Sequence, residues 1–201
     1  MQLIRSRADT EVLLHDGSIV SIRDATAADA ADVRRFMDNL SPSSRYLRFL
    51  MAIREFPEEM LRRLTHPAED HEVVLVASTA TAGIVGITQY VVDENEEGCE
   101  FAIVIADAWQ RQGLGYCMLQ ALYRVAMDNG IRHGHADVLA DNYAMRSLAS
   151  KLGCEICTNA DSPFLLKICK RFDRSLAVRS LPSPARDAGS RHCEAAIRHT
   201  Q

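Results

Sequence analysis

Hydrophobic and polar positions change their period several times along the chain, and these changes predict its strands and helices. Alternation predicts a strand over 18–23. Apolar spacings of three and four predict a helix after Thr26, and a second begins at Ser41-Pro42. A third helix is expected over 58–64. Three runs rich in β-branched residues come next, with turn-like segments between them, and predict an antiparallel meander over 73–78, 84–92 and 99–105.

The second half of the chain contains the clearest helix. Apolar residues follow one stripe from Leu114 to Asn129, where Asn129-Gly130 ends the pattern. A strand is expected over 131–139, a helix over 143–152, and two final strands over 154–158 and 164–169. This order predicts an α/β (α+β) fold around one central mixed sheet.

Both ends of the chain differ from this central part. Residues 1–17 are expected to be a short lead-in, and residues 18–169 the folded domain. Residues 170–201 hold prolines and serines with only scattered apolar residues, so we expect a disordered tail. The tail has a net charge of +4, whereas the whole chain of 201 residues has −4, so residues 1–169 carry −8.

Composition narrows the class of protein. With 47% hydrophobic and 25% charged residues the chain is typical of one globular domain. No apolar run approaches the ~18 residues of a membrane span, and no apolar segment marks a signal peptide, so a cytoplasmic protein without a membrane partner is expected. An acidic balance argues against nucleic acid as a partner.

Two sets of side chains raise the alternative of a metal or redox site. Cys154 and Cys157 have C-x-x-C spacing, but no second pair accompanies them, and on a strand they would face opposite sides. His133 and His135 could share a strand face, yet a third ligand is not visible. We therefore expect no metal, and reduced thiols in place of a disulfide scaffold.

The strongest local signal for chemistry is a glycine turn between a strand and the long helix, with the sequence Gln110-Arg111-Gln112-Gly113-Leu114-Gly115. Glycines at this spacing let the backbone turn tightly and approach a ligand. Free amides at a helix N-terminus favour a phosphate group. The P-loop signature is absent, because Tyr116-Cys117 stands where Lys-Ser/Thr would be, and so is the third glycine of a dinucleotide fingerprint.

In context, this turn resembles a known family. The apolar strand 100–105, the glycine turn and the long helix together resemble the acetyl-CoA-binding core of the GNAT superfamily of N-acyltransferases. Asn142, Ala144, Leu148 and Gly153 resemble a segment of the family's next helix. The stretch 40–49 (LSPSSRYLRF) is similar to the acetyltransferase domain of bacterial Pat-type protein-lysine acetyltransferases. The resemblance implies a GNAT fold with a mostly antiparallel twisted sheet of six to seven strands flanked by helices.

The resemblance also implies where the cosubstrate acetyl-CoA would bind. Its pyrophosphate would lie on the glycine turn, at Gln110, Arg111, Gln112, Gly113, Leu114 and Gly115. The pantetheine arm would pair with main chain at Ile103, Val104 and Ile105, near Asn142, beside a bulge that splays two strands. The amide of Val104 would polarise the acetyl carbonyl.

Glu100 is the expected catalytic base, since a lysine-like amine must lose a proton before it attacks a thioester. Burial would make this carboxylate a better base. The alternative is a strand-end carboxylate in an acidic turn. Many members of the family have a tyrosine that protonates the leaving thiolate, but Ala149 stands at that position here. Solvent would therefore supply this proton. Candidates for the border of the acceptor cleft are Arg45, Tyr46, Arg48, Tyr90 and Asp93.

These expectations combine into one function. The protein would transfer acetyl from acetyl-CoA to a primary amine of a protein lysine, by direct attack in a ternary complex. The alternatives are a small-molecule amine as acceptor, or an acyl-CoA-binding sensor without activity.

Overall fold

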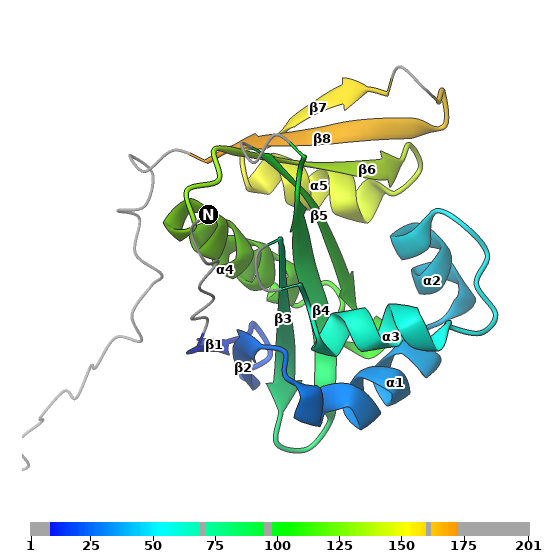
Figure 1. Ribbon diagram of the computed structural model, residues 1–201, viewed down its shortest axis with the longest axis vertical. Helices are drawn as coiled ribbons and strands as arrows, with labels where there is room; N and C mark the ends of the chain where they lie inside the picture. The colour runs from blue at the N-terminus through cyan, green and yellow to red at the C-terminus, as the bar shows by residue number, and fades with distance from the viewer. Residues whose placement is uncertain (1–8, 69–70, 95–97, 160–161, 173–201) are drawn as a thin grey trace, which may run out of the picture.

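The computed structural model describes residues 9–68, 71–94, 98–159 and 162–172, and its centre is one mixed sheet (Figure 1). In the described residues eight strands follow the order β1-β2-β3-β4-β5-β6-β8-β7. Their bounds are Asp9–Leu13 (β1), Ile19–Asp24 (β2), Glu72–Thr79 (β3), Gly83–Val92 (β4), Gly98–Ile105 (β5), His133–Leu139 (β6), Glu155–Thr158 (β7) and Leu165–Arg171 (β8). The α-helices are Ala30–Asp38 (α1), Pro42–Phe49 (α2), Glu58–Thr65 (α3), Leu114–Asp128 (α4) and Tyr143–Lys151 (α5).

The predicted class of fold is confirmed. β3, β4 and β5 form the expected antiparallel meander, and β5 and β6 pair in parallel. The strand number is a correction, because the sheet has eight strands where six to seven were expected. β1 lies in the segment expected to be a lead-in, and β8 runs past residue 169 to Arg171. The expected tail otherwise lies outside the described residues.

The sequence pattern did not predict β1, because its charged residues interrupt the alternation of apolar and polar positions. Asp9 and Glu11 face solvent, whereas Val12 is buried opposite Val20 of β2, and Leu14 is buried just beyond the strand. These apolar contacts bind the first strand to the sheet edge.

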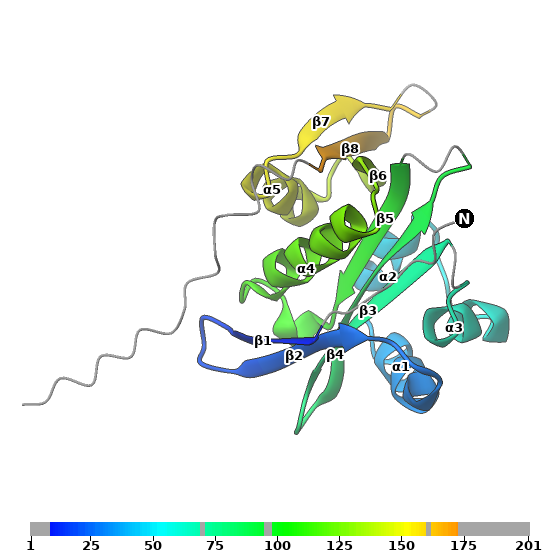
Figure 2. The same cartoon turned by 60° about the vertical axis from the view of Figure 1, so that its left-hand side comes forward.

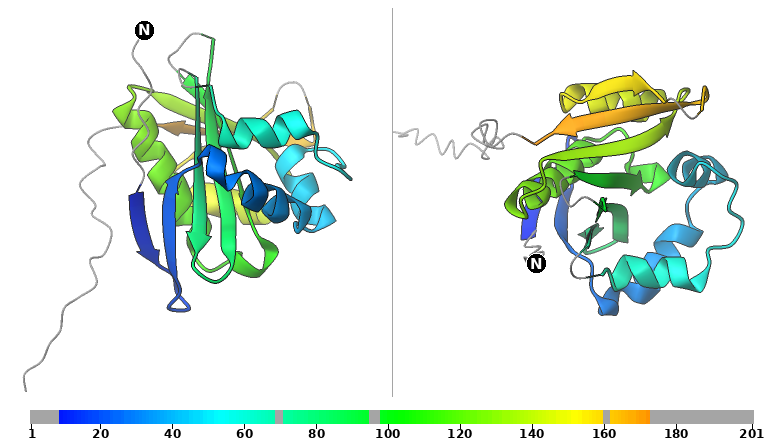
Figure 3. Two further views of the ribbon diagram at one scale, coloured as in Figure 1. Left: turned by 60° about the horizontal axis from the view of Figure 1, so that its bottom comes forward. Right: turned by 45° about the horizontal axis from the view of Figure 1, so that its top comes forward.

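Helices cover the two faces of the sheet (Figures 2 and 3). α1 and α3 pack on one face through a cluster that includes Val33, Leu61 and Val104, and α2 contacts β5 beside it. α4 packs on the opposite face, where Met118 and Phe101 belong to a second cluster. β5 therefore has side chains in both layers, alternating along the strand.

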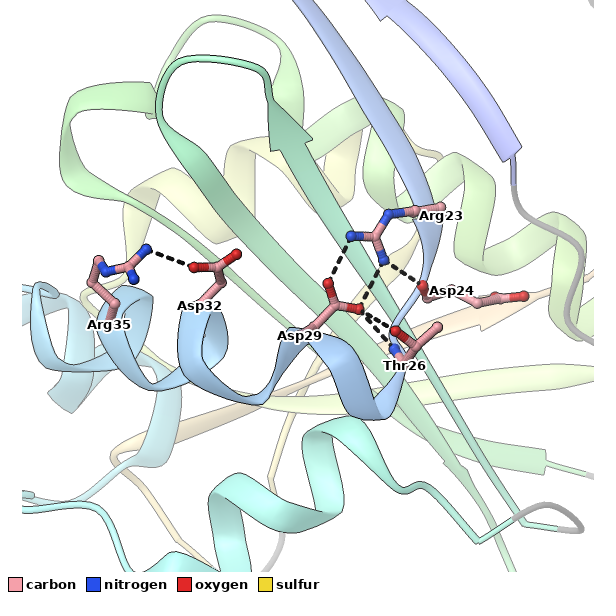
Figure 4. Close-up of polar contacts among 6 residues, drawn as sticks. All are labelled: Arg23, Asp24, Thr26, Asp29, Asp32 and Arg35. Atoms are coloured by element: carbon pink, nitrogen blue, oxygen red, sulfur yellow. Dashed lines mark hydrogen bonds and ion pairs between the residues drawn. The ribbon is translucent and has the colours of Figure 1, made fainter.

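A buried carboxylate fixes the entry to α1 (Figure 4). Asp29 is 6% exposed and accepts two hydrogen bonds from the Arg23 guanidinium, at 2.7 and 2.8 Å. It also accepts from the amide and the hydroxyl of Thr26, at 2.8 and 2.9 Å. The hydrogen bonds from Arg23, followed by those from Thr26, lower the pKa of Asp29 to about 2, although burial opposes them.

In the described ranges, none of the helices has the length and apolar character needed to cross a bilayer.

Candidate active site

β5 and β6 separate partway along their length, and the resulting gap is the centre of the candidate site. The two strands pair only from Gly98–His133 to Glu100–His135. Beyond this point β5 continues to Ile105 on β4, and β6 continues to Leu139 on β8. Main-chain groups of both strands are therefore left facing the gap.

Two hydrogen bonds show which groups of β5 face the gap. Asp93 N–H donates to the Gly98 carbonyl, and Ala106 N–H donates to the Val85 carbonyl, both at 2.9 Å. Backbone direction alternates along a strand, so the even-numbered residues of β5 point their amides and carbonyls at β4. Those of Ile103 and Ile105 point away from β4, toward β6.

This alternation differs from the expectation for Val104. Val104 pairs with Ile87 in the β4–β5 register, so its amide points at β4. The register runs without a shift from Gly86–Ile105 to Val92–Cys99, so the gap opens without the expected bulge in β5. Among the three expected pantetheine contacts, the structure favours the main chain of Ile103 and Ile105.

The glycine turn brings backbone amides to one end of this gap. Arg111 and Gly113 both have positive φ, +63° and +94°, and Gly113 is the N-cap of α4. The first amides of a helix have no acceptor within it, so those of Leu114 and Gly115 point out of the N-terminus. A Cβ on Gly115 would lie 3.2 Å from the side-chain end of Leu148 of α5, so any larger residue would require Leu148 to move by a few tenths of an ångström.

The side chains of this turn divide into two groups. Arg111 is exposed, whereas Leu114 is buried in the core and can offer only its amide to a ligand. Gln112 donates to the Ala108 carbonyl at 3.0 Å, and its Oε1 is buried without a hydrogen-bond partner. This oxygen accepts hydrogen bonds only, so its partner must be an N–H or O–H donor and not a phosphate oxygen.

Gln110 was expected to contact the cosubstrate, but its side chain makes hydrogen bonds within the protein. Its amide donates to the Ile105 carbonyl and to the Ser44 hydroxyl, both at 3.1 Å. Asp107 accepts from the Ser41 and Ser44 hydroxyls at 2.7 Å and from the Ser41 amide at 3.0 Å. Burial alone would raise the pKa of Asp107, but these hydrogen bonds lower it overall. The start of α2 is thus held against the loop that leads to the glycine turn.

Asn142 is the N-cap of α5, with its Oδ1 accepting from the Met145 amide at 3.1 Å. This leaves the amide nitrogen of the same side chain available for another acceptor.

Glu100 lies on the other side of the gap, where β5 and β6 still pair. Glu100 is four residues from Val104, which belongs to the layer of α1 and α3, so its side chain points to that face. The side chain is exposed, which contradicts the burial that we expected. An incoming amine or a water molecule can therefore reach it directly.

The candidate residues around the acceptor cleft are not equivalent. Arg48 is half-buried on α2 and lies 4.8 Å over the Phe49 ring. Burial lowers the pKa of Arg48 to about 10, and the charge of Glu100 acts in the opposite direction. Tyr46 is exposed. Tyr90, by contrast, is fully buried and accepts a hydrogen bond from Asn129 at 2.8 Å, so its hydroxyl belongs to the core.

The histidine and cysteine residues do not form a metal site in the described parts of the chain, where no group of three or more suitable ligands occurs. His135 Nδ1 lies 3.8 Å from Asp93, an ion pair only when the imidazole is protonated. Cys154 packs near the Tyr123 hydroxyl, and burial raises its pKa, whereas Cys157 is exposed. The C-x-x-C pair therefore does not converge on one site.

One residue near the glycine turn was missed in the sequence. A Cβ on Gly113 would lie 3.4 Å from the His15 imidazole, and the His15 amide makes a long hydrogen bond of 3.5 Å to the Gln112 carbonyl. His15 precedes Asp16-Gly17 in the turn after β1. That dipeptide signals a turn, but only the paired β1 brings it beside a loop almost one hundred residues away.

Together, the gap and the amides at the start of α4 fit a long ligand with a phosphate at one end and an extended amide-bearing arm. Coenzyme A has this form. The fold and the site therefore define an acyl-CoA-dependent transferase.

Comparison with known proteins identifies the family. The family described as acetyltransferase (GNAT) domain matches residues 20–155. Acetyltransferase PA5475 from Pseudomonas aeruginosa is 36% identical over 143 residues, which are 70% of this chain and 77% of that protein. The chain belongs to the GNAT acetyltransferase family and is an acetyl-CoA-dependent N-acetyltransferase.

Solved structures show the same fold. The GNAT domain of S. lividans PAT superposes with a TM-score of 0.75 at 23% identity, covering 81% of this chain and 96% of that one. RimL, a ribosomal L7/L12 alpha-N-protein acetyltransferase in complex with coenzyme A, has a TM-score of 0.62 at 12% identity, with 86% and 99% covered.

Proposed function

We propose that this protein transfers acetyl from acetyl-CoA to the side-chain amine of a protein lysine. The observation that carries acetyl transfer to an amine is the position of the exposed Glu100 at the end of the β5–β6 gap, beside α2. The likeness to the GNAT domain of S. lividans PAT, with the 40–49 stretch on α2, supports a protein acceptor.

Acetyl-CoA would enter from the glycine turn. The amides of Gln112, Gly113, Leu114 and Gly115 would donate to its pyrophosphate, with Arg111 as the nearby cation. The arm would lie in the gap along β5, where the Ile103 and Ile105 main chain points toward β6. The free amide nitrogen of Asn142 would contact the same arm. Gln110 acts as a positioning residue in this proposal, because its side chain holds the Ile105 carbonyl.

The chemical step needs a base and a hydrogen-bond donor. Glu100 accepts a proton from the ammonium group, directly or through one water, and the free amine attacks the thioester carbonyl carbon. The N–C bond forms, the nitrogen gives its second proton to solvent, the C–S bond breaks, and the electron pair leaves with sulfur. The Ile103 amide donates to the carbonyl oxygen as charge develops there, a contact typically worth ~3 kcal/mol. Solvent protonates the thiolate, since Ala149 has no proton to give.

The test is Glu100→Gln, with Glu11→Gln as a control on the exposed edge strand β1. Loss of the base should lower kcat about 100-fold, while the Kd for coenzyme A, measured by calorimetry, stays unchanged. The control should keep full activity. Equal kcat values for both variants would refute the role of Glu100.

The same assay separates the alternatives. A small-molecule acetyltransferase would use free amines in place of lysine peptides, and would still depend on Glu100. An acyl-CoA sensor would bind coenzyme A but acetylate no amine even before mutation.

A further inference from the structure

Two arginines lie one turn apart on α2, and their surroundings differ. The Arg45 guanidinium donates to three backbone carbonyl oxygens at 2.7 to 3.1 Å and lies 5.0 Å over the Phe56 ring. All of these contacts are within the protein. Arg45, which was a candidate for the acceptor cleft, therefore ties α2 to its neighbouring loops.

Arg48 shares the ring contact but makes no such hydrogen bonds within the described part of the chain. It is half-buried over the Phe49 ring, and its guanidinium makes no hydrogen bond or ion pair with any residue in the described ranges. A guanidinium carries five donors and is seldom removed from water without an acceptor. The pKa of Arg48 is lowered to about 10 for this reason, by burial.

Arg48 and Glu100 lie on two elements, α2 and β5, that contact each other. α2 packs against β5, and Glu100 projects from β5 on the face that α1 and α3 cover. The charge of Glu100 acts on Arg48 by raising its pKa, although no ion pair joins the two side chains. An amine held at Glu100 would therefore bring its neighbouring atoms close to a guanidinium that has no hydrogen-bond partner among the described residues.

We propose that Arg48 binds a carboxylate carried by the acceptor, so that the preferred substrate is an amine with a carboxylate close to it. This inference rests on the proposed acetyl transfer. The planar guanidinium matches a carboxylate through two parallel hydrogen bonds. A singly charged carboxylate forms a neutral pair with Arg48, whereas a dianionic phosphate would leave a net negative charge beside Glu100. The carboxylate would come from an acidic residue beside a protein lysine or from a free amino acid.

Kinetics on matched acceptors test this proposal. The peptides share one sequence and differ only beside the lysine, which is flanked by Glu, Gln or phosphoserine. Free lysine and lysinamide form a second pair that differs in the carboxylate. The wild type should prefer the carboxylate-bearing member by about 10- to 100-fold in kcat/KM, mainly through KM, as expected for a charge-assisted hydrogen bond. A preference for the Glu peptide over the Gln peptide would identify a protein acceptor. A preference for free lysine over lysinamide would identify a free amino acid.

Arg48→Gln should abolish the preference, because kcat/KM should fall about 10- to 100-fold for the carboxylate-bearing acceptors and much less for the Gln peptide. Arg48→Lys should retain part of the preference, because lysine keeps the positive charge but cannot donate two parallel hydrogen bonds. Arg124→Gln, an exposed arginine on α4, is the control and should behave as wild type. Unchanged thermal unfolding and unchanged Kd for coenzyme A would show that the variants are folded.

Other outcomes overturn the proposal. Equal kcat/KM for the carboxylate and amide acceptors in the wild type, or an equal loss for both in Arg48→Gln, would contradict it while leaving acetyl transfer intact. Preference for the phosphoserine peptide would show that phosphate is the ligand. A wild type that acetylates none of these amines would refute the proposed function, and this inference with it.

Discussion

Gly113 occupies a backbone conformation that side chains avoid, at the point where α4 and the proposed pyrophosphate site begin. Its φ is +94°, and an added Cβ would also lie 3.4 Å from His15. Gly113→Ala should lower the free energy of unfolding by about 1 kcal/mol, and it should raise the Kd for coenzyme A about tenfold by shifting the amides of the turn.

Gly130→Ala is the matched control for this variant. Gly130 has φ +83°, follows the other end of α4, and has no atom within 4 Å of an added Cβ. Gly130→Ala should lower the free energy of unfolding by a similar amount and leave the Kd for coenzyme A unchanged. Chemical denaturation and calorimetry measure both quantities. If Gly113→Ala lost only stability, the glycine turn would not be the phosphate site.

At individual residues, the sequence predicts the type of site better than the role of each atom. The glycine turn is predicted from its residue types and spacing, and Glu100 mainly from the family resemblance. The direction of the Val104 amide depends on strand register, which the spacing of residues does not reveal. The bonds that occupy Gln110 depend on Ser44, a partner 66 residues away in the chain.

Among the elements, the start of α1 depends most clearly on pH. Four hydrogen bonds from Arg23 and Thr26 hold the Asp29 carboxylate, and they lower its pKa from 3.8 to about 2. A depressed pKa means that this contribution is complete above about pH 4 and is lost as the pH falls toward 2. Asp29→Asn should lower the free energy of unfolding by about 2 kcal/mol at pH 7, and the difference from wild type should shrink across that window.

Asp32→Asn is the control at the same helix. Asp32 pairs with Arg35 at 2.6 Å on the surface of α1, and such exposed pairs contribute little. Its loss should change stability by less than about 0.5 kcal/mol. Urea denaturation at several pH values gives these free energies. A pH-independent difference between wild type and Asp29→Asn would contradict the assignment of this contribution to the carboxylate.

Helix starts were predictable from local sequence, whereas their tertiary partners were not. Ser41-Pro42 predicts the beginning of α2, and the Ser41 hydroxyl accepts from the Ser44 amide at 3.1 Å. The same two serines also donate to Asp107, which follows β5 and lies more than 60 residues away in the chain. That contact forms only when β5 and α2 pack together, so no local sequence pattern predicts it.

Over the whole molecule, the sequence predicts the order of elements and the class of sheet. It underestimates the extent of the fold at the first strand, because β1 has few apolar residues and is stabilised by pairing with β2. The acidic balance of residues 1–169, with a net charge of −8, also has a consequence for binding. In the proposed site, local amides and Arg111 would hold the polyanionic cosubstrate, since the overall field opposes it.

The central claim is that this chain moves acetyl from coenzyme A to protein lysines. The most direct measurement incubates the protein and Glu100→Gln with radiolabelled acetyl-CoA and a cell lysate, and then separates proteins from small molecules. We predict label on lysine side chains of proteins with the wild type, and little label with Glu100→Gln. Label found only in small molecules, or in neither fraction, would contradict the claim.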